Sequence, residues 1–170
     1  MKRVMVIGGS GAGKSTFARK LSAVTSLPVV HLDQLNWEPN WIQTAPDKAA
    51  ARGRHAVAQD EWIIEGNYSI TFAERIARAD TIIFLDYPAR TRVWRVLVRM
   101  LKYRGQTRPD LAKDCPERID LTFLPWVWGY SKRGGRRRAL KILDNYKNRK
   151  QTMRLASNRD VEGFLRNQMI

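Results

Sequence analysis

The residues whose types and spacing can carry chemistry begin directly after the apolar run Val4–Ile7. They read Gly-Gly-Ser-Gly-Ala-Gly-Lys-Ser-Thr, which is the G-x-x-x-x-G-K-S spacing of a P-loop. Glycines let backbone N–H groups turn inward around phosphate oxygens, and the helix that follows points its positive end at the same anion. The motif predicts a triphosphate site built from Gly8, Gly9, Ser10, Gly11, Ala12, Gly13, Lys14, Ser15 and Thr16.

Three side chains of this motif have distinct expected tasks. Lys14 can reach the β- and γ-phosphates, Ser15 can hold Mg²⁺, and Thr16 can bond the α-phosphate. ATP and Mg²⁺ are therefore the expected ligands. The alternative is a glycine-rich turn that precedes a lysine by coincidence, and such a turn would not need the strand and helix patterns that flank this one.

Apolar runs alternate with helical patterns along the chain, and this alternation is typical of a parallel α/β sheet with helices on both faces. The 170 residues are expected to form a single domain, 1–170. Residues 36–46 hold two prolines and two tryptophans and are expected to be a loop. Strands are expected at 2–7, 29–32, 62–64, 81–85 and 151–156, and helices at 14–24, 47–59, 69–79, 89–103, 136–150 and 160–167.

Two segments depart from the alternation. Residues from about 104 to 121 have little periodicity and are expected to be a mobile lid or insert. The aromatic run 123–130 is expected to be a helix that packs the lid down; base stacking is its alternative.

Composition limits the partners and the compartment. The formal charge is +15, and it is uneven: residues 1–86 hold 10 Lys/Arg against 9 Asp/Glu, whereas residues 87–170 hold 21 against 7. The second half is therefore expected to face an anion, either nucleotide phosphates or nucleic acid. The longest apolar runs are too short for a membrane span, and the single Cys115 cannot form an internal disulfide, so we expect a cytoplasmic protein without membrane contact.

Beyond the P-loop, five further stretches carry a resemblance to a known family. They are H-L-D-Q-L-N-W, W-I-I-E-G-N-Y, I-F-L-D-Y-P-A-R, Y-R-G-Q-T-R-P-D and C-P-E-R. With these, the chain resembles the nucleoside monophosphate kinase branch of P-loop proteins, and most closely the small adenylate-kinase-like group known as topology modulation proteins. The resemblance implies a five-stranded parallel sheet of order 2-3-1-4-5.

The resemblance also implies roles for individual residues. Glu65 stands where adenylate kinases hold the aspartate that organises Mg²⁺ through water, and Asp33 matches an acid that contacts the acceptor or metal-bound water. Arg95 matches an arginine that packs on adenine, and Arg99 matches one that reaches phosphate. Asp33 or Glu65 can also accept the proton of an acceptor hydroxyl.

Further residues carry over on analogy alone. Arg104 and Arg108 are lid candidates for substrate binding, Asn67 and Tyr68 are expected to line the acceptor pocket, and Asn158 lies where this superfamily contacts the nucleotide base. The third-strand turn reads E-G-N-Y instead of D-G-F-P-R. The acceptor-binding arginine of adenylate kinases is therefore missing, and the acceptor is left open.

Each of the charged candidates has a structural alternative. Asp33 can be a helix cap or turn residue, Glu65 a salt-bridge partner, and Arg95 and Arg99 part of a solvated helix face. The chain as a whole has an alternative too: an ATP-binding protein that acts on DNA or RNA and contacts its backbone through Arg136–Arg138. We expect a kinase with a small-molecule acceptor, as a monomer or homodimer.

Overall fold

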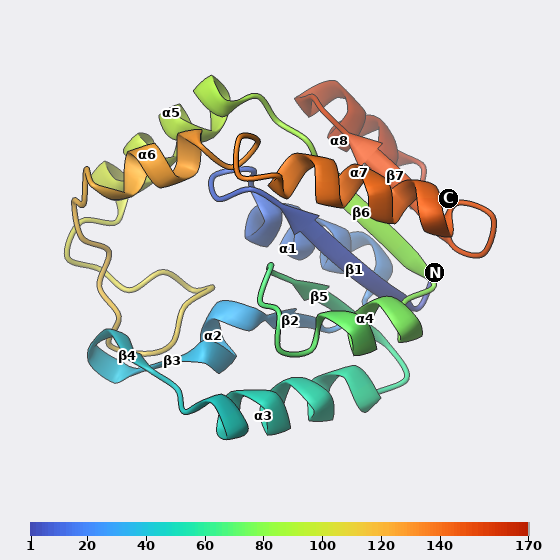
Figure 1. Ribbon diagram of the computed structural model, residues 1–170, viewed down its shortest axis with the longest axis horizontal. Coiled ribbons are helices and arrows are strands. Elements are labelled where there is room, and N and C mark those ends of the chain that lie inside the picture. Colours follow the sequence, from blue (N-terminus) through green and yellow to red (C-terminus); the bar gives the residue numbers. More distant parts are fainter. Residues whose placement is uncertain (170) are drawn as a thin grey trace.

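A computed structural model describes residues 1–169, which form a five-stranded sheet with helices on both faces (Figure 1). All neighbouring strands in this sheet are parallel. From edge to edge they are β2 (Val29–His31), β5 (Trp62–Glu65), β1 (Arg3–Gly8), β6 (Thr81–Leu85) and β7 (Gln151–Leu155). The strands β3 and β4 lie outside this sheet. When the five strands of the sheet are numbered 1 to 5 along the chain, their order from edge to edge is 2-3-1-4-5, and the expected order is confirmed.

The central strands are apolar along their whole length because helices cover both of their faces. Val4 and Val6 of β1 are completely buried toward one face, and Met5 and Ile7 are buried toward the other. The helices are α1 (Lys14–Thr25), α2 (Leu32–Asn36), α3 (Pro46–Ala58), α4 (Phe72–Arg78), α5 (Ala89–Lys102), α6 (Phe123–Trp128), α7 (Gly135–Tyr146) and α8 (Asn158–Arg166). None of them, within residues 1–169, is long and apolar enough to cross a bilayer.

Each face of the sheet has its own group of helices. Phe17 and Leu21 of α1 and Phe164 of α8 pack on the face of Val4 and Val6. α3, α4 and α7 pack on the opposite face, where they meet Met5 and Ile7. This arrangement leaves the carboxyl ends of the strands, and the P-loop with them, at an edge that the covering helices do not close.

The segment expected to be a loop at 36–46 contains more structure than its composition indicated. β2 ends at His31, and Leu32 begins the short helix α2 instead of continuing the strand. A small antiparallel hairpin follows, with strands β3 (Trp37–Glu38) and β4 (Ile42–Gln43) around the 3₁₀ turn Pro39–Trp41. The rings of its two tryptophans meet edge to face, a contact between side chains that a loop prediction does not consider.

The expected lid runs from the end of α5 to α6 without a helix or strand, in this described part of the chain. It reaches across to α2 and the hairpin, where Gln34 donates to the Pro109 carbonyl (2.8 Å) and Trp41 donates to the Pro116 carbonyl (3.0 Å). The aromatic run after it forms α6 as expected, and α6 packs on α5 through Val127 and Met100. The lid is therefore docked at both sides in this structure (Figure 1).

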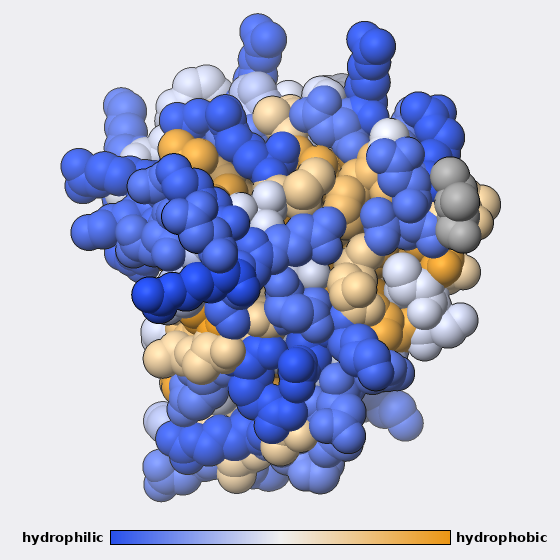
Figure 2. Space-filling view, turned by 90° about the vertical axis from the view of Figure 1, so that its right-hand side faces the viewer, coloured by the Kyte–Doolittle hydropathy of each residue, from blue (hydrophilic) through white to orange (hydrophobic). Residues whose placement is uncertain are grey.

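The surface is strongly hydrophilic over the side that carries the C-terminal elements. Figure 2, which faces the right-hand side of Figure 1, shows charged and polar side chains with smaller apolar areas between them. On α7, Arg137 and Arg138 are exposed. Arg136 instead donates to Asp86 at the end of β6 (2.9 Å), so the three arginines do not form one uniform basic surface.

The P-loop is packed directly against α5. Arg92 is buried there, with its guanidinium donating to the carbonyls of Tyr87 (3.2 Å) and Val127 (2.8 Å). A Cβ on Gly11 would lie 2.3 Å from the Arg92 carbonyl oxygen, and Gly11 has φ +78°. A side chain at this position is excluded by both space and backbone conformation.

This packing predicts unequal costs for two alanine substitutions in the same loop. Gly11→Ala is expected to destabilise the protein by about 2–5 kcal/mol, because a left-handed backbone and a clash with α5 add together. Gly13→Ala has a similar φ of +89° but nothing nearer than 3.5 Å, so it should cost only about 1–2 kcal/mol. Urea unfolding of both variants measures the difference; equal costs would mean that α5 does not press on the loop.

Candidate active site

A large cleft of about 1330 Å³ follows the carboxyl ends of the strands. Small-molecule sites commonly measure about 300–1,000 Å³, so this cleft has room for two substrates. In parallel α/β sheets, ligands bind at this edge because the loops that follow the strands meet there. The lining residues come from the P-loop, the ends of β2 and β5, α5, the lid and the start of α8.

The P-loop supplies the donors for an anion. Gly13 is the N-cap of α1 and has no side chain to accept a bond from the first helical turn. The first N–H groups of a helix have no partner within the helix, so here they stay available to a ligand. Ser10 through Thr16 all line the cleft, while Gly8 and Gly9 lie behind them and shape the turn.

Asn67 holds the base of this loop. Its side-chain amide donates to the Gly8 carbonyl (2.6 Å) and accepts from the Gly8 N–H (3.4 Å). Asn67 also lines the cleft, as expected for a residue near the acceptor. Its contacts add a second task, because they join the turn after β5 to the turn after β1.

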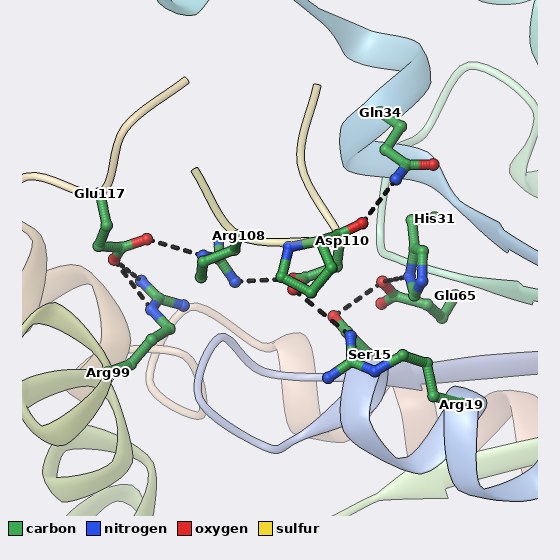
Figure 3. Close-up of polar contacts among 10 residues, drawn as sticks. Ser15, Arg19, His31, Gln34, Glu65, Arg99, Arg108, Asp110 and Glu117 are labelled. Carbon is green, nitrogen blue, oxygen red and sulfur yellow. Dashed lines mark hydrogen bonds and ion pairs between the residues drawn. The ribbon is translucent and has the colours of Figure 1, made fainter. Parts of the chain in front are cut away.

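A buried carboxylate lies beside the hydroxyl that was expected to hold Mg²⁺. The Ser15 hydroxyl donates to Glu65 Oε1 (2.9 Å), and the same oxygen meets His31 Nδ1 at 2.8 Å (Figure 3). Ser15 starts α1, Glu65 ends β5 and His31 ends β2, so three neighbouring elements meet at one oxygen. A hard cation takes oxygen ligands of this kind, and the residues present therefore fit the magnesium site expected at Ser15 and Glu65.

The two acidic candidates have opposite pKa shifts. Burial raises the pKa of Glu65, but the bond to His31 and the charge of Lys14 outweigh it and hold this pKa below its usual value. Burial raises the pKa of Asp33, and the negative charge of Glu65 raises it further, against the opposing effects of Lys14 and Arg108. Two carboxyls with divergent pKa values in one cleft are typical of sites that divide acid–base tasks.

Asp33 is not the helix cap that was its structural alternative. It lies in the first turn of α2, whose N-cap is His31, and no side-chain capping bond is present there. Asp33 lines the cleft instead. Glu65 fits both the metal site that was expected for it and its alternative as a salt-bridge partner, since it contacts Ser15 of the P-loop and also pairs with His31.

Arg95 and Asn158 meet in the lining of the cleft. Arg95 donates to Asn158 Oδ1 (2.7 Å) and to the Ala12 carbonyl (3.1 Å). Its guanidinium lies 3.9 Å from the centre of the Tyr87 ring, and the Tyr87 hydroxyl donates to the same Asn158 oxygen (2.8 Å). A guanidinium stacked over an aromatic ring has a second flat face, on which a base can stack.

Arg99 and Arg108 line the cleft, but each is already paired. Arg99 donates to Glu117 of the lid (2.9 Å), and Arg108 donates to Asp110 (2.7 Å) (Figure 3). Arg108 Nε also lies 2.7 Å from the second oxygen of Glu117, as an ion pair without hydrogen-bond geometry. Arg99 is therefore not part of a solvated helix face, which was its structural alternative.

The structure brings together most of the residues expected at the site. Lys14, Asp33, Glu65, Arg95 and Arg99 all line the same cleft, and so do the acceptor candidates Asn67, Tyr68 and Arg108. Arg104 lies outside the lining, where its backbone pairs with that of Glu117 in an isolated bridge.

Several lining residues were not anticipated. His31 is outside the lining but contacts Glu65, and its place at the end of a strand beside that of Glu65 was the signal that could have found it. Trp37 and Trp41 were assigned to a loop. Asp110 and Glu117 lie in the two stretches Y-R-G-Q-T-R-P-D and C-P-E-R, and their pairing partners could not be found from spacing.

Comparison with known proteins identifies the fold. No protein-family model and no curated protein matches the chain. A shikimate kinase from Acinetobacter baumannii in complex with shikimate aligns with a TM-score of 0.56 and 14% identity, over 98% of this chain and 90% of that one. A shikimate kinase from Bacteroides thetaiotaomicron aligns with a TM-score of 0.53 and 17% identity, over 98% and 95%.

A gluconokinase from Sinorhizobium meliloti 1021 aligns less closely, with a TM-score of 0.51 and 15% identity, over 99% of this chain and 89% of that one. At these identities the likeness establishes the fold alone. The class that the fold and the phosphate loop define is that of the P-loop NTPases, as predicted from the sequence.

The raised pKa of Asp33 predicts a stability gain when its charge is removed. The folded protein binds the proton more tightly than the unfolded chain does. The ionised carboxylate therefore costs the folded state free energy above the folded pKa, and this cost vanishes as the pH falls to the usual value of 3.8. Asp33→Asn should raise Tm at pH 8 and raise it less at pH 4.

Calorimetry across this pH range provides the measurement. Asp60→Asn is the control, since the Asp60 side chain is fully exposed and its substitution should leave Tm unchanged. A lower Tm for Asp33→Asn at pH 8 would mean that Asp33 stabilises the fold.

Proposed function

We propose that the chain is an ATP-dependent phosphotransferase of the adenylate-kinase-like type, which transfers the γ-phosphate of Mg·ATP to the hydroxyl of a small acceptor. In this proposal residues 1–170 form one kinase-like domain with its lid at about 104–121. The observation that carries it is the contact of Ser15 with Glu65 at 2.9 Å, at the start of a helix whose first N–H groups are free. Kinases also appear among the structural neighbours, which supports this reaction class.

The nucleotide would bind along the P-loop side of the cleft. The N–H groups of the loop and Lys14 bind the phosphates, and the surface of Arg95, Tyr87 and Asn158 receives the base. When bound, Mg²⁺ neutralises charge on the β- and γ-phosphates; Ser15 would ligate it, and Glu65 would orient its water. Phosphoryl transfer needs such positioning and neutralisation more than covalent chemistry by the protein.

The acceptor would bind on the other side, between Asp33 and the lid. Asp33 accepts the proton of the attacking hydroxyl as the new bond from that oxygen to the γ-phosphorus forms. The bond from the γ-phosphorus to the bridging oxygen breaks, and ADP leaves with that oxygen. Asp33 is suited to this task because its raised pKa makes it a better proton acceptor than an ordinary aspartate.

Nucleic-acid binding is less well supported than phosphoryl transfer. Only Arg137 and Arg138 of the basic triplet are exposed, since Arg136 is engaged by Asp86. The basic excess of the second half is also partly used inside the fold, where Arg99 and Arg108 pair with lid carboxylates and Arg154 pairs with Asp86 (2.8 Å).

Removal of the P-loop lysine tests the proposed function. Lys14→Ala is expected to lower ATP turnover roughly 10²–10³-fold, because a cation that stabilises the transferred phosphoryl group is lost. Turnover is measured as ADP formation, and binding as the heat of titration with Mg·ATP. Lys48→Ala is the control, since Lys48 is an exposed residue of α3 that pairs with Glu38.

Lys14→Ala, together with a double variant of Arg137 and Arg138, separates the two candidate functions. A kinase loses turnover with Lys14→Ala and keeps its fold. Salt-sensitive binding of an oligonucleotide that survives Lys14→Ala and weakens in an Arg137→Ala, Arg138→Ala double variant would favour the nucleic-acid function instead.

A second prediction concerns the metal. Glu65→Gln keeps the size of the side chain and removes its charge, so the Mg²⁺ concentration needed for half-maximal turnover should rise roughly 10–100-fold. Titration of turnover with MgCl₂ at fixed ATP provides the measurement, with circular dichroism to verify the fold. An unchanged Mg²⁺ requirement would remove Glu65 from the metal site.

A further inference from the structure

The acceptor side of the cleft has few cations available for a ligand. Lys14 and Arg95 belong to the nucleotide side in the proposed function. Arg108 makes contacts of 2.7 Å with both Asp110 and Glu117, and Arg99 also pairs with Glu117. These two carboxylates are buried. An arginine that left one of them to bind an anionic ligand would leave a buried negative charge without a partner, which is unfavourable.

The remaining charges near Asp33 are negative or exposed. Asp33 and Glu65 are carboxylates of the same cleft. Arg19 lies 3.5 Å from Asp110, which uses part of its charge as well. Arg118 and Lys102 also line the cleft, but both are exposed, and an exposed cation gains little from pairing with an anion in water.

Aromatic side chains make up much of the same side. The rings of Trp37 and Trp41 lie 5.5 Å apart at 75°, and Trp37 Nε1 donates to the Tyr68 hydroxyl (3.0 Å). Such a wall packs against the faces of a flat or cyclic ligand and provides little for a compact anion.

The lid holds this wall in place. Trp41 donates to the Pro116 carbonyl, the Asn40 N–H donates to the Asp114 carbonyl (2.8 Å), and Gln34 donates to the Pro109 carbonyl. The ion pairs of Arg108 lie within the same lid segment. A ligand that pulled Arg108 away from its carboxylates would therefore also disturb the segment that covers the cleft.

From this juxtaposition of paired arginines, carboxylates and aromatic rings we infer the acceptor class: an electrically neutral alcohol that contains a ring, such as a nucleoside or a sugar. Nucleoside monophosphates and hydroxy acids are excluded as preferred acceptors. This inference rests on the proposed function and deepens it. The reaction is ATP plus the alcohol giving ADP, the phosphate monoester and one proton, which Asp33 receives first and then releases to water.

The experiment compares matched pairs that differ by one charged group. The probes are thymidine with thymidine monophosphate, and glucose with glucuronate, extended to other nucleosides, pentoses and cyclitols with their phosphate or carboxylate derivatives. ADP formation is followed with each. At least one neutral alcohol is expected to be used with a kcat/KM at least tenfold above that of its charged partner.

Two variants test the stated cause. Glu117→Gln removes the carboxylate charge with which Arg99 and Arg108 both pair. The variant should therefore turn over the charged acceptor of each pair faster, and its preference for the neutral acceptor should be smaller. Glu61→Gln is the control, because Glu61 is exposed and pairs with Lys2 outside the cleft. Trp41→Leu should raise KM for the neutral acceptor more than it lowers kcat, whereas Trp41→Phe, which keeps a ring, should raise KM less.

Different outcomes would contradict the acceptor class and the proposed phosphotransferase function. Preference for the charged partners, or stimulation by none of the neutral alcohols while Lys14-dependent Mg·ATP binding persists, would overturn the acceptor class and leave the nucleotide site intact. An absence of any binding heat with Mg·ATP in folded protein would instead overturn the proposed function itself.

Discussion

The structure depends on a glycine-rich turn between β1 and α1, in which there is no room for a side chain at Gly11. Gly11 lies against the carbonyl oxygen of Arg92, and Arg92 is buried between the loop, Val127 and the Tyr130 ring. This contact keeps α5 on the phosphate loop and brings α6 with it. The same absence of side chains leaves the N–H groups at the start of α1 free, so packing and anion binding follow from one constraint.

Two of the arginines that line the cleft, Arg99 and Arg108, are already paired with carboxylates of the lid. Glu65 is stabilised as an anion by Ser15, His31 and Lys14, whereas Asp33 is half-buried close to another carboxylate and its pKa is raised. The lid adds two more carboxylates and uses them to hold Arg99 and Arg108. A chain with a large positive charge thus has a cleft in which several arginines are already neutralised.

The lid connects these features. It pairs with α5 through Glu117, approaches α1 through Asp110, and contacts α2 and the hairpin through backbone carbonyls. Without a helix or strand of its own in the described residues, it is held by side chains from the elements around it. Its conformation is consequently coupled to the same arginines that a phosphate would attract.

The phosphate-loop side of the cleft was predictable from short stretches of sequence. The P-loop is local: its glycines, lysine and serine act within one turn, so spacing alone identifies them. Arg95 and Asn158 came from the resemblance to adenylate kinases, and the structure brings them to within 2.7 Å of each other. Asp33 and Glu65 also came from this resemblance, and both lie near strand ends, where parallel strands meet at one edge of the sheet.

The sequence by itself determined the fold class and the phosphate loop, because periodicity and local motifs specify these over a few residues, and its resemblance to adenylate-kinase-like proteins supplied the strand order. Only the tertiary structure decided which charges remain available. The pairing of Arg108 with Glu117, the contact of His31 with Glu65, and the meeting of Trp37 with Trp41 in a hairpin all depend on packing between elements. Spacing along a chain does not encode such contacts, since a charged residue looks the same in sequence whether it is free or neutralised.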